Sequence, residues 1–353
     1  MGAYVYIVGK IIEMPKVVYL LGAGVSYDSI PVVERFVEEI EGILIILRGM
    51  VITNKMVFAS NGKILLDTAI EDLLFLQAGC IDHRSVDTFA KKLFLTSHIL
   101  ENRYNYARLK NSVVLFFELY RFFHKKVDKR YDGFIATLLN NTPTRFPSDV
   151  NILSWNYDYE FERAYHKYCP EKQHLEEVYN DINFVHKNHK KTVSNKGLFS
   201  VLKINGTAGF FDSNHKLILG LGYPDLMGSS AENWHAEVFP ILEKYLEYCL
   251  PENGYSSAIS FSWESDNGEQ KILKRIENCI FNAEKLVIIG YSFPYFNRQI
   301  DRFIVNTIKH DKIKVYIQDP LSDELVEVLQ ELKQWPLNAI KPIRNCKQYY
   351  MDI

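Results

Sequence analysis

Apolar residues recur along the chain with two spacings, and each spacing predicts a different kind of element. Short continuous runs rich in β-branched residues are typical of buried strands; they lie at 16–21, 150–154, 201–205, 216–223, 285–292 and 312–319. Apolar residues three and four positions apart are typical of amphipathic helices; they lie at 31–47, 231–249, 269–281, 297–309 and 321–333. Strands that alternate with helices predict an α/β fold, with a Rossmann-like parallel sheet flanked by helices.

The segment from residue 51 to residue 140 has the helical spacing alone, in the runs DTAIEDLLFLQ, VDTFAKKLFLTSHIL and NSVVLFFELYRFFHKKV. We therefore expect a helical insertion after the first βα unit. The chain then divides into a discontinuous Rossmann domain, 1–50 and 141–353, and an inserted helical module, 51–140. An aromatic stripe in this module is expected in the helix core or at a subunit interface; it comprises Phe116, Phe117, Tyr120, Phe122 and Phe123.

The composition is that of a globular protein that can bury a substantial core. Of the 353 residues, 47% are hydrophobic and 24% are charged, and the formal net charge is −2. This charge does not favour nucleic-acid binding, and the lysine-rich segment 187–191 is more typical of a solvated loop. No run approaches the roughly 20 apolar residues of a membrane span. Residues 1–16 are interrupted by Lys10, Glu13 and Pro15, so we expect a strand or hairpin there rather than a signal peptide.

The cysteines indicate a reduced, cytoplasmic protein without a metal centre. They are odd in number, widely separated and never arranged as CxxC, so neither a disulfide framework nor a zinc site is expected. The five are Cys80, Cys169, Cys249, Cys279 and Cys346.

The motif LLGAGVS, residues 20–26, stands between the first predicted strand and the first predicted helix. Glycines at such a junction let backbone N–H groups approach an anion, and the following helix presents its positive end. A plain turn that binds nothing is the alternative. The third glycine of a dehydrogenase fingerprint is replaced by Tyr27, and no lysine followed by serine or threonine closes the turn. An ordinary dinucleotide fold and a Walker loop are therefore disfavoured.

Polar residues follow several of the other predicted strands, where the ligands of parallel sheets gather. After the strand at 150–154 come Trp155, whose ring can stack, and Asn156, whose amide can hold a ribose hydroxyl or orient a water. Asp158 follows, where a helix cap is the alternative role.

The later strands end in the same way. The run at 201–205 ends in Asn205 before a glycine, which can mark a tight turn alone. Gly290 and Ser292 follow the most apolar strand of the chain and permit close approach of a ligand. Asp319 closes the last predicted strand, either to accept a ribose hydroxyl pair or to cap the next helix.

The order of these motifs resembles the silent information regulator two (sirtuin-like) superfamily. GAGVS, WNYD, the KxxG turn, VIIGYSFP and the strand ending in DP recur in that order, over about 16–31 and 151–320. The chain looks most like the NAD-hydrolysing sirtuin-like effectors of bacterial anti-phage defence systems. The resemblance implies an NAD-binding fold that cleaves the bond between nicotinamide and ribose, with cell death by NAD depletion.

Carried over by position, the resemblance assigns a role to each motif. The turn residues Gly22, Ala23, Gly24 and Ser26 would hold the diphosphate and the adjoining ribose, and Gly290 and Ser292 match the adenosine-side loop. Asn156 matches the catalytic asparagine, which orients groups around a developing oxocarbenium centre. Asp319 stands where the family often has asparagine.

Two departures from the family pattern change the expected chemistry. The four-cysteine zinc module of the deacetylases is absent from the sequence, so protein deacetylation is not expected. Asn205 stands in place of the catalytic histidine, and an amide cannot act as a general base near neutral pH. Another histidine can substitute (His215, His186 or His235), the asparagine can be an engineered inactivating change, or the chain can be a natural non-catalytic binding subunit.

We therefore predict an NAD+ glycohydrolase of anti-phage defence, or its catalytically weakened relative. The alternative is a module that binds NAD or ADP-ribose to control assembly with a partner, without breaking a bond. A homo-oligomer and a partner protein of the defence system are expected, whereas a membrane, a metal and direct nucleic-acid binding are not. A nuclease or helicase subunit has no support, because no carboxylate metal cluster or dense basic stripe occurs in the sequence.

Overall fold

The computed structural model divides the protein into two compact units. It describes residues 5–7, 10–12, 17–53, 60–139, 145–186, 199–221, 234–264, 269–309 and 312–351. Unit 1 comprises Met1–Tyr27, Asp128–Gly206 and Ser260–Ile353, and unit 2 comprises Asp28–Val127 and Thr207–Ile259. The domain boundaries expected at residues 50 and 140 stay a prediction. We describe each unit by itself.

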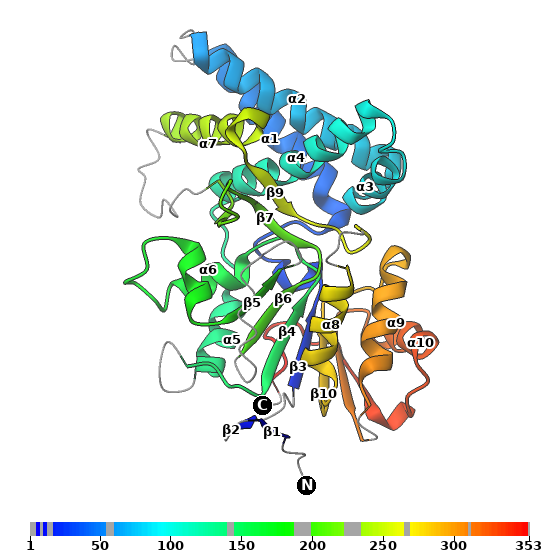
Figure 1. The fold of residues 1–353 in the computed structure, drawn as a ribbon. Helices are drawn as coiled ribbons and strands as arrows, with labels where there is room; N and C mark the ends of the chain where they lie inside the picture. The colour runs from blue at the N-terminus through cyan, green and yellow to red at the C-terminus, as the bar shows by residue number, and fades with distance from the viewer. Residues whose placement is uncertain are drawn as a thin grey trace. The chain divides into compact units, whose positions relative to one another are not determined.

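Unit 1 is built on a seven-stranded parallel sheet, as the alternating pattern predicted (Figure 1). The strand order is β12-β11-β10-β3-β4-β6-β5, and every pair of neighbours is parallel. The strands are β3 (Val17–Leu21), β4 (Val150–Ser154), β5 (Asn183–His186), β6 (Ser200–Lys203), β10 (Lys285–Ile289), β11 (Lys314–Gln318) and β12 (Ile340–Ile343).

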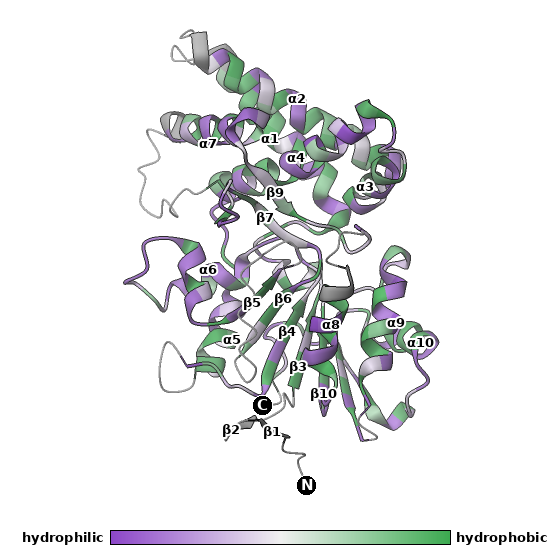
Figure 2. Ribbon diagram, viewed as in Figure 1, coloured by the Kyte–Doolittle hydropathy of each residue, from purple (hydrophilic) through white to green (hydrophobic). Residues whose placement is uncertain are grey.

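Helices cover both faces of this sheet, which explains why its central strands β3 and β10 are mainly apolar rather than alternating (Figure 2). Val18 and Leu20 of β3 pack on the face covered by α8, α9 and α10. Val17, Tyr19 and Leu21 point to the other face, which α5 and α6 cover. These helices are α5 (Lys129–Leu139), α6 (Glu160–His166), α8 (Glu269–Ile280), α9 (Arg298–Thr307) and α10 (Ser322–Leu332).

Unit 2 is mainly helical. Its helices are α1 (Val33–Thr53), α2 (Ser60–His83), α3 (Val86–Leu95), α4 (Leu100–His124) and α7 (Trp234–Cys249). A three-stranded sheet belongs to the same region, with the order β8-β7-β9: β7 (Gly206–Phe211), β8 (Leu217–Leu219) and β9 (Ser256–Ile259). The helical region α1–α5 therefore follows the first strand of the parallel sheet, as the sequence predicted.

The aromatic stripe of α4 lies in the core of unit 2, one of the two places predicted for it. Phe116, Phe117 and Tyr120 are buried, and the Phe116 ring packs on Phe36 of α1 with 4.3 Å between centroids. Phe122 and Phe123 are half-buried. Intramolecular packing thus accounts for most of the stripe.

Several elements differ from the prediction. The run at 216–223 forms only β8, and β8 pairs antiparallel with β7 outside the parallel sheet, because a tight turn at residues 212–216 joins the two strands. The helical spacing at 86–100 is broken after Leu95, where the Thr96 hydroxyl donates to the Lys92 carbonyl at 2.8 Å. The short strands β5, β7, β9 and β12 were not predicted.

Other expectations were confirmed or lie outside the described part. The N-terminal segment forms the predicted hairpin, β1 (Val5–Ile7) with β2 (Lys10–Ile12). The lysines at 187–191 lie outside the described residues. None of the helices in the described part of the chain has the length and hydrophobicity to cross a bilayer. All five cysteines are free, and burial raises the pKa of Cys80 and of Cys279 to about 12.

Candidate functional site

The topology of unit 1 places a switch point between β3 and β10. From β3 the chain proceeds to β4 on one side of the sheet, and later returns to β10 on the other side. Ligands of open parallel sheets bind in the crevice outside the carboxyl ends of the strands at such a point. The motifs after β3, β4 and β10 are therefore the residues to consider first.

The glycines of the first turn are required by a neighbouring turn. A Cβ on Gly22 would lie 2.5 Å from the Gly290 carbonyl oxygen, and one on Gly24 would lie 2.8 Å from the Gly290 Cα. Gly290 itself has φ of +59°, which favours glycine. The Gly22 N–H donates to Ile289 at 3.0 Å and the Gly24 N–H donates to Gly290 at 2.9 Å. Two amides that the sequence assigned to a diphosphate thus already hold the turn after β10, and only Ala23 is exposed at the tip.

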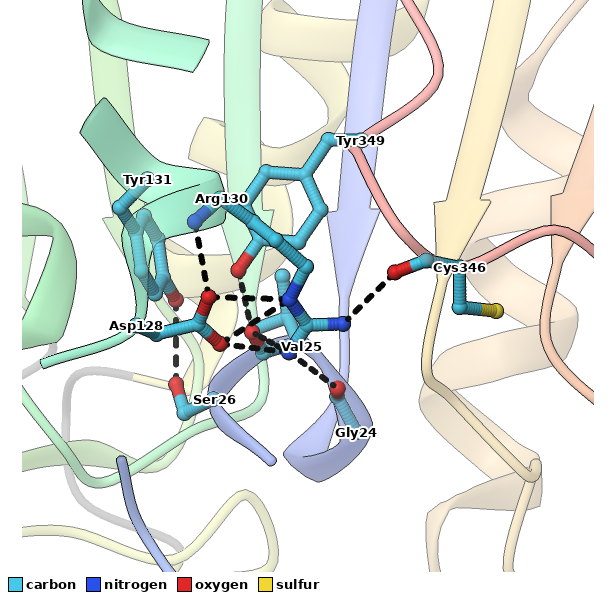
Figure 3. Close-up of polar contacts among 8 residues, drawn as sticks. All are labelled: Gly24, Val25, Ser26, Asp128, Arg130, Tyr131, Cys346 and Tyr349. Carbon is cyan, nitrogen blue, oxygen red and sulfur yellow. Dashed lines mark hydrogen bonds and ion pairs between the residues drawn. The ribbon is translucent and has the colours of Figure 1, made fainter. Parts of the chain in front are cut away.

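An arginine holds the opposite, carbonyl end of this turn (Figure 3). The Arg130 guanidinium donates to the Val25 carbonyl at 3.1 Å and to the Gly24 carbonyl at 3.5 Å. Its charge is balanced by Asp128, whose carboxylate accepts from Arg130 Nε at 2.9 and 3.1 Å. Arg130 therefore holds the carbonyl groups of the turn, while its first amides bond to the loop after β10. Arg130 was not predicted, since no local motif in the sequence marks it.

The segment 344–351, which we call the C-terminal strap, also holds the glycine turn. The Tyr349 hydroxyl donates to the Val25 carbonyl, and Arg130 donates to the Cys346 carbonyl at 3.3 Å (Figure 3). The Tyr349 ring also lies under the Arg130 guanidinium at 5.1 Å from its centroid. Residues more than 300 positions apart in the chain therefore hold the glycine turn.

Ser26 and Asp158 meet inside unit 1. Ser26 is fully buried, and its Oγ lies 3.1 Å from the Tyr131 hydroxyl. Asp158 accepts the Glu160 N–H at 3.1 Å just before α6, whose N-cap position is held by Tyr159. Burial raises the pKa of Asp158, while Lys203 and a hydrogen bond from Ser26 oppose this rise. The contacts of Ser26 are therefore with the protein interior.

A buried ion pair contacts the backbone that follows β4. Lys203 is 2% exposed, and its Nζ donates to the Asp158 carbonyl at 2.7 Å. The same Nζ lies 3.2 Å from Glu162 Oε1, and Tyr179 donates to that carboxylate at 2.9 Å. The lysine fixes the backbone of the WNYD loop against β6 and α6. A single lysine in the apolar run VLKIN was the signal in the sequence that could have revealed it.

Trp155 and Asn156 carry buried polar atoms without a hydrogen-bond partner among the described residues. The Trp155 ring stacks on Tyr291 at 5.6 Å with an interplanar angle of 10°, so a protein ring occupies one of its faces. Its indole nitrogen has no partner. Asn156 is 7% exposed, and its Nδ2 has no partner either. A buried donor left unpaired costs about 1–3 kcal/mol of stability. Asn156 Nδ2 is therefore a candidate donor to a ligand.

Asn205 has a different environment, because the structure uses both ends of its amide. Its Oδ1 accepts the Ser262 N–H at 3.0 Å, and its Nδ2 donates to the Trp155 carbonyl at 3.4 Å. The side chain is 3% exposed. Asn205 thus joins the end of β4 to the loop at 260–264, a structural role that the sequence did not predict.

The remaining predicted residues lie at the ends of β10 and β11. Ser292 is exposed, next to Gly290. Asp319 is half-buried and accepts the Leu321 N–H at 2.9 Å in the turn before α10, whose N-cap position is held by Leu321. Burial raises the pKa of Asp319, and the bond from Leu321 opposes this. The Gly290 N–H donates to the Gln318 carbonyl at 3.0 Å. Asp319 therefore directly follows a residue that is hydrogen-bonded to the Gly290 turn.

The three histidines considered as substitutes for the missing base have different places in the chain. His186 is fully buried at the end of β5, and β6 separates that strand from β4. His215 belongs to unit 2, in the turn between β7 and β8 with φ of +60°. The side chain of His235 lies outside the described residues.

A second buried cluster, absent from the prediction, lies under the GYS loop. The Tyr291 hydroxyl donates to the Asp301 carboxylate at 2.9 and 3.1 Å and accepts from Asn297 Nδ2 at 3.1 Å. Asn297 is 3% exposed, and its Oδ1 has no partner among the described residues. The loop after β10 therefore has its own supporting network.

A hollow of about 470 Å³ occurs elsewhere in unit 1, between α8 and α9. Its lining includes Glu277, Phe281, Asn306, Thr307 and Lys309, toward the carboxyl ends of the two helices. Those helix ends lead into the amino ends of β10 and β11. The hollow is thus mainly on the side of the sheet opposite the motifs.

Taken together, the glycine turn and the Gly290 loop pack on each other at the switch point of the sheet, and Asn156 follows β4, the strand beside β3. The Asn156 amide has the chemistry to orient a polar ligand, and Arg130 and Tyr349 hold the glycine turn through its carbonyl groups. Comparison with known proteins adds no relative: no family model matches the chain, and no curated protein matches it.

Proposed function

We propose that unit 1 binds NAD+ at the carboxyl ends of β3, β4 and β10 and hydrolyses its nicotinamide–ribose bond. The observation that carries the proposal is the Asn156 amide after β4, whose buried Nδ2 lacks a partner among the described residues. An acceptor on the ribose or an attacking water would recover the cost of that unpaired donor.

The reaction needs little from the protein beyond orientation and charge stabilisation. The bond between C1′ and the nicotinamide nitrogen breaks, nicotinamide leaves with the electron pair, and water adds to C1′ as its proton passes to solvent. Asn156 would orient the ribose or the water while positive charge develops at C1′. The Lys203 bond to the Asp158 carbonyl would keep the Asn156 loop in place during this step.

The experiment follows free nicotinamide during incubation of the purified chain with NAD+. The Asn156→Ala variant is expected to lose at least 100-fold in rate, with NAD+ affinity changed much less. Asn151→Ala is the matched control on β4, the strand that leads to Asn156, since the buried Asn151 amide donates to the Cys279 carbonyl at 3.0 Å in a purely structural bond. Equal loss in both variants would contradict a role for Asn156.

A second candidate function is favoured by Asn205, whose amide serves the fold and offers no general base. In this case the site binds NAD or ADP-ribose without turnover and controls assembly with a partner. Binding without nicotinamide release, together with turnover in Asn205→His, would support it. An imidazole can still accept the Ser262 N–H, so this variant can keep the loop at 260–264 in place.

The biological setting is proposed from the motif order alone. A sirtuin-like hydrolase of this kind would act in anti-phage defence by NAD depletion, as a homo-oligomer or with a partner protein of the same system. Loss of cellular NAD+ on phage infection, dependent on Asn156, would test this setting.

A further inference from the structure

The hollow between α8 and α9 is a feature of unit 1 that the proposed reaction does not use. The two helices pack on the same face of the parallel sheet (Figure 1). The volume of the hollow, about 470 Å³, lies within the range of pockets that hold small molecules. Its lining residues lie outside the motifs that follow β3, β4 and β10. The hollow is therefore considered as a site of its own.

One face of α9 forms most of the lining. Gln299, Arg302, Phe303 and Asn306 all line the hollow. Their three- and four-residue spacing places them on the same side of the helix, whereas Ile304 on the other side is fully buried in the core. The two amides and the guanidinium are hydrogen-bond donors. The face of α9 that the core leaves uncovered is thus rich in donors.

The charged side chains of the lining leave the hollow with unpaired positive charge. Its carboxylate, Glu277, already accepts from Lys274, one turn earlier on α8, at 2.6 Å. No hydrogen bond or ion pair joins the side chain of Arg302 or of Lys309 to another residue in the described part of the chain. Two cations without a carboxylate partner in one hollow attract an anion.

Phe281 holds one of these cations at the hollow. The Lys309 ammonium lies 5.3 Å from the centroid of the Phe281 ring, and the Lys309 N–H donates to the Phe281 carbonyl at 3.5 Å. Lys309 follows the carboxyl end of α9, where the helix dipole also favours a cation. Arg302 lies in the middle of α9, so the dipole does not account for the second cation.

We propose that this hollow binds a small organic anion with about two negative charges, such as a phosphate monoester. Arg302 and Lys309 neutralise the anionic group, and Phe303 contacts the apolar part of the ligand. The amides of Gln299 and Asn306 donate to its oxygens. A guanidinium also matches the geometry of carboxylates, so a dicarboxylate shares this chemistry. The site does not depend on the proposed hydrolysis of NAD+.

The test measures the binding of phenyl phosphate to the full chain by titration calorimetry. Arg302→Ala is expected to weaken binding about tenfold or more, because it removes a charged hydrogen-bond donor. Asn306→Trp keeps both cations but fills the hollow, so it should abolish binding. Arg145→Ala is the matched control, since Arg145 is an exposed arginine of unit 1 outside the hollow. This variant should bind phenyl phosphate as the parent does.

A second arm uses isophthalate, a dicarboxylate of similar size. Isophthalate binding that is lost in Arg302→Ala and in Asn306→Trp, without phenyl phosphate binding, would support the site and assign it to dicarboxylates. Saturating NAD+ should leave the affinity for either anion unchanged. Displacement by NAD+, no binding of either anion to the parent, unchanged binding in Asn306→Trp, or equal affinity of Arg302→Ala and Arg145→Ala would overturn the proposal. The nicotinamide assay tests the proposed function independently of each of these outcomes.

Discussion

At the scale of single residues, Asp301 shows how burial changes the chemistry of a side chain. Its carboxyl is 1% exposed on α9 and accepts the Tyr291 hydroxyl. Burial raises its pKa to about 7, although the Tyr291 bond and the nearby Arg298 both lower it. The folded protein therefore binds this proton more tightly than the unfolded chain, in which the carboxyl titrates near pH 4.

This difference predicts a pH dependence of stability with a definite sign. Between about pH 4 and pH 7 the folded state holds a proton that the unfolded state has released, so stability falls as pH rises. The loss amounts to about 4 kcal/mol at most, from a pKa difference of about three units. Asp301→Asn should remove this slope and raise the unfolding free energy at pH 8, as measured by urea denaturation from pH 4 to pH 8.

Tyr291→Phe is the companion variant for this measurement. It deletes the hydrogen bond that lowers the Asp301 pKa, so the slope should persist and its upper limit should move to higher pH. A slope that survives unchanged in Asp301→Asn would refute the assignment to this carboxyl.

At the scale of elements, the ion pair between Lys203 and Glu162 joins β6 to α6. Both side chains are almost completely buried, and Lys203 also holds the backbone after β4.

The main strands could be predicted because their apolar runs are long enough to stand out. β5 and β12 could not, because NFVH and IKPI are short and contain polar residues or proline.

Removal of one partner from this pair should be costly. Lys203→Met leaves the Glu162 carboxylate buried without its cation, and we expect a loss of about 3–5 kcal/mol in unfolding free energy. The double variant Lys203→Met/Glu162→Gln should recover part of this loss, since no uncompensated charge remains. Urea denaturation checks both.

The pair Lys274–Glu277 on α8 is the matched control, because its side chains are 67% and 37% exposed. Lys274→Met should cost less than about 1 kcal/mol. A similar cost for Lys203→Met would show that the buried pair does not stabilise the junction of β6 and α6.

At the scale of the whole molecule, the chain passes between the two units after Tyr27, Val127, Gly206 and Ile259. Within unit 1, the C-terminal strap returns to the first strands. Gln318, at the end of β11, donates from Nε2 to the carbonyls of Asn345 and Gln348, both at 2.6 Å, and its Oε1 accepts the Tyr350 N–H at 2.8 Å. One amide therefore binds three backbone groups of the strap.

Gln318→Glu should release the strap. The substitution keeps the acceptor for Tyr350 but turns a double donor into a carboxylate oxygen facing two carbonyls, at a site only 2% exposed. We expect a loss of about 3 kcal/mol or more in unfolding free energy, and faster amide exchange in the strap and in the glycine turn that Tyr349 contacts.

Gln330→Glu is the control for this variant, since half-buried Gln330 donates to the single carbonyl of Trp335 at 2.7 Å. It should cost less because water can reach the new charge. Equal losses in the two variants, or unchanged exchange in the glycine turn, would contradict the proposed function of Gln318 in holding the strap.

The candidate site was only partly predictable. Motif order and strand ends identified the glycine turn, Asn156 and the Gly290 loop as neighbours, because carboxyl ends of parallel strands share one edge of a sheet. The partners of each polar group were not predictable. Asn205 and Asp158 are used by the fold, whereas Asn156 Nδ2 has no partner in the described part of the chain, and no local pattern distinguishes these cases.

The sequence by itself determined the main helices and the central strands of the sheet, and with them the α/β class, because spacing of apolar residues is a local property that the backbone geometry of strands and helices imposes. Only the tertiary structure decided which polar groups are satisfied. Val25 meets Tyr349 and Gly24 meets Gly290 across long stretches of chain, and such contacts arise from packing rather than from neighbouring residues. The glycines are thus required by one turn packing on another, a reason that the sequence of either turn does not contain.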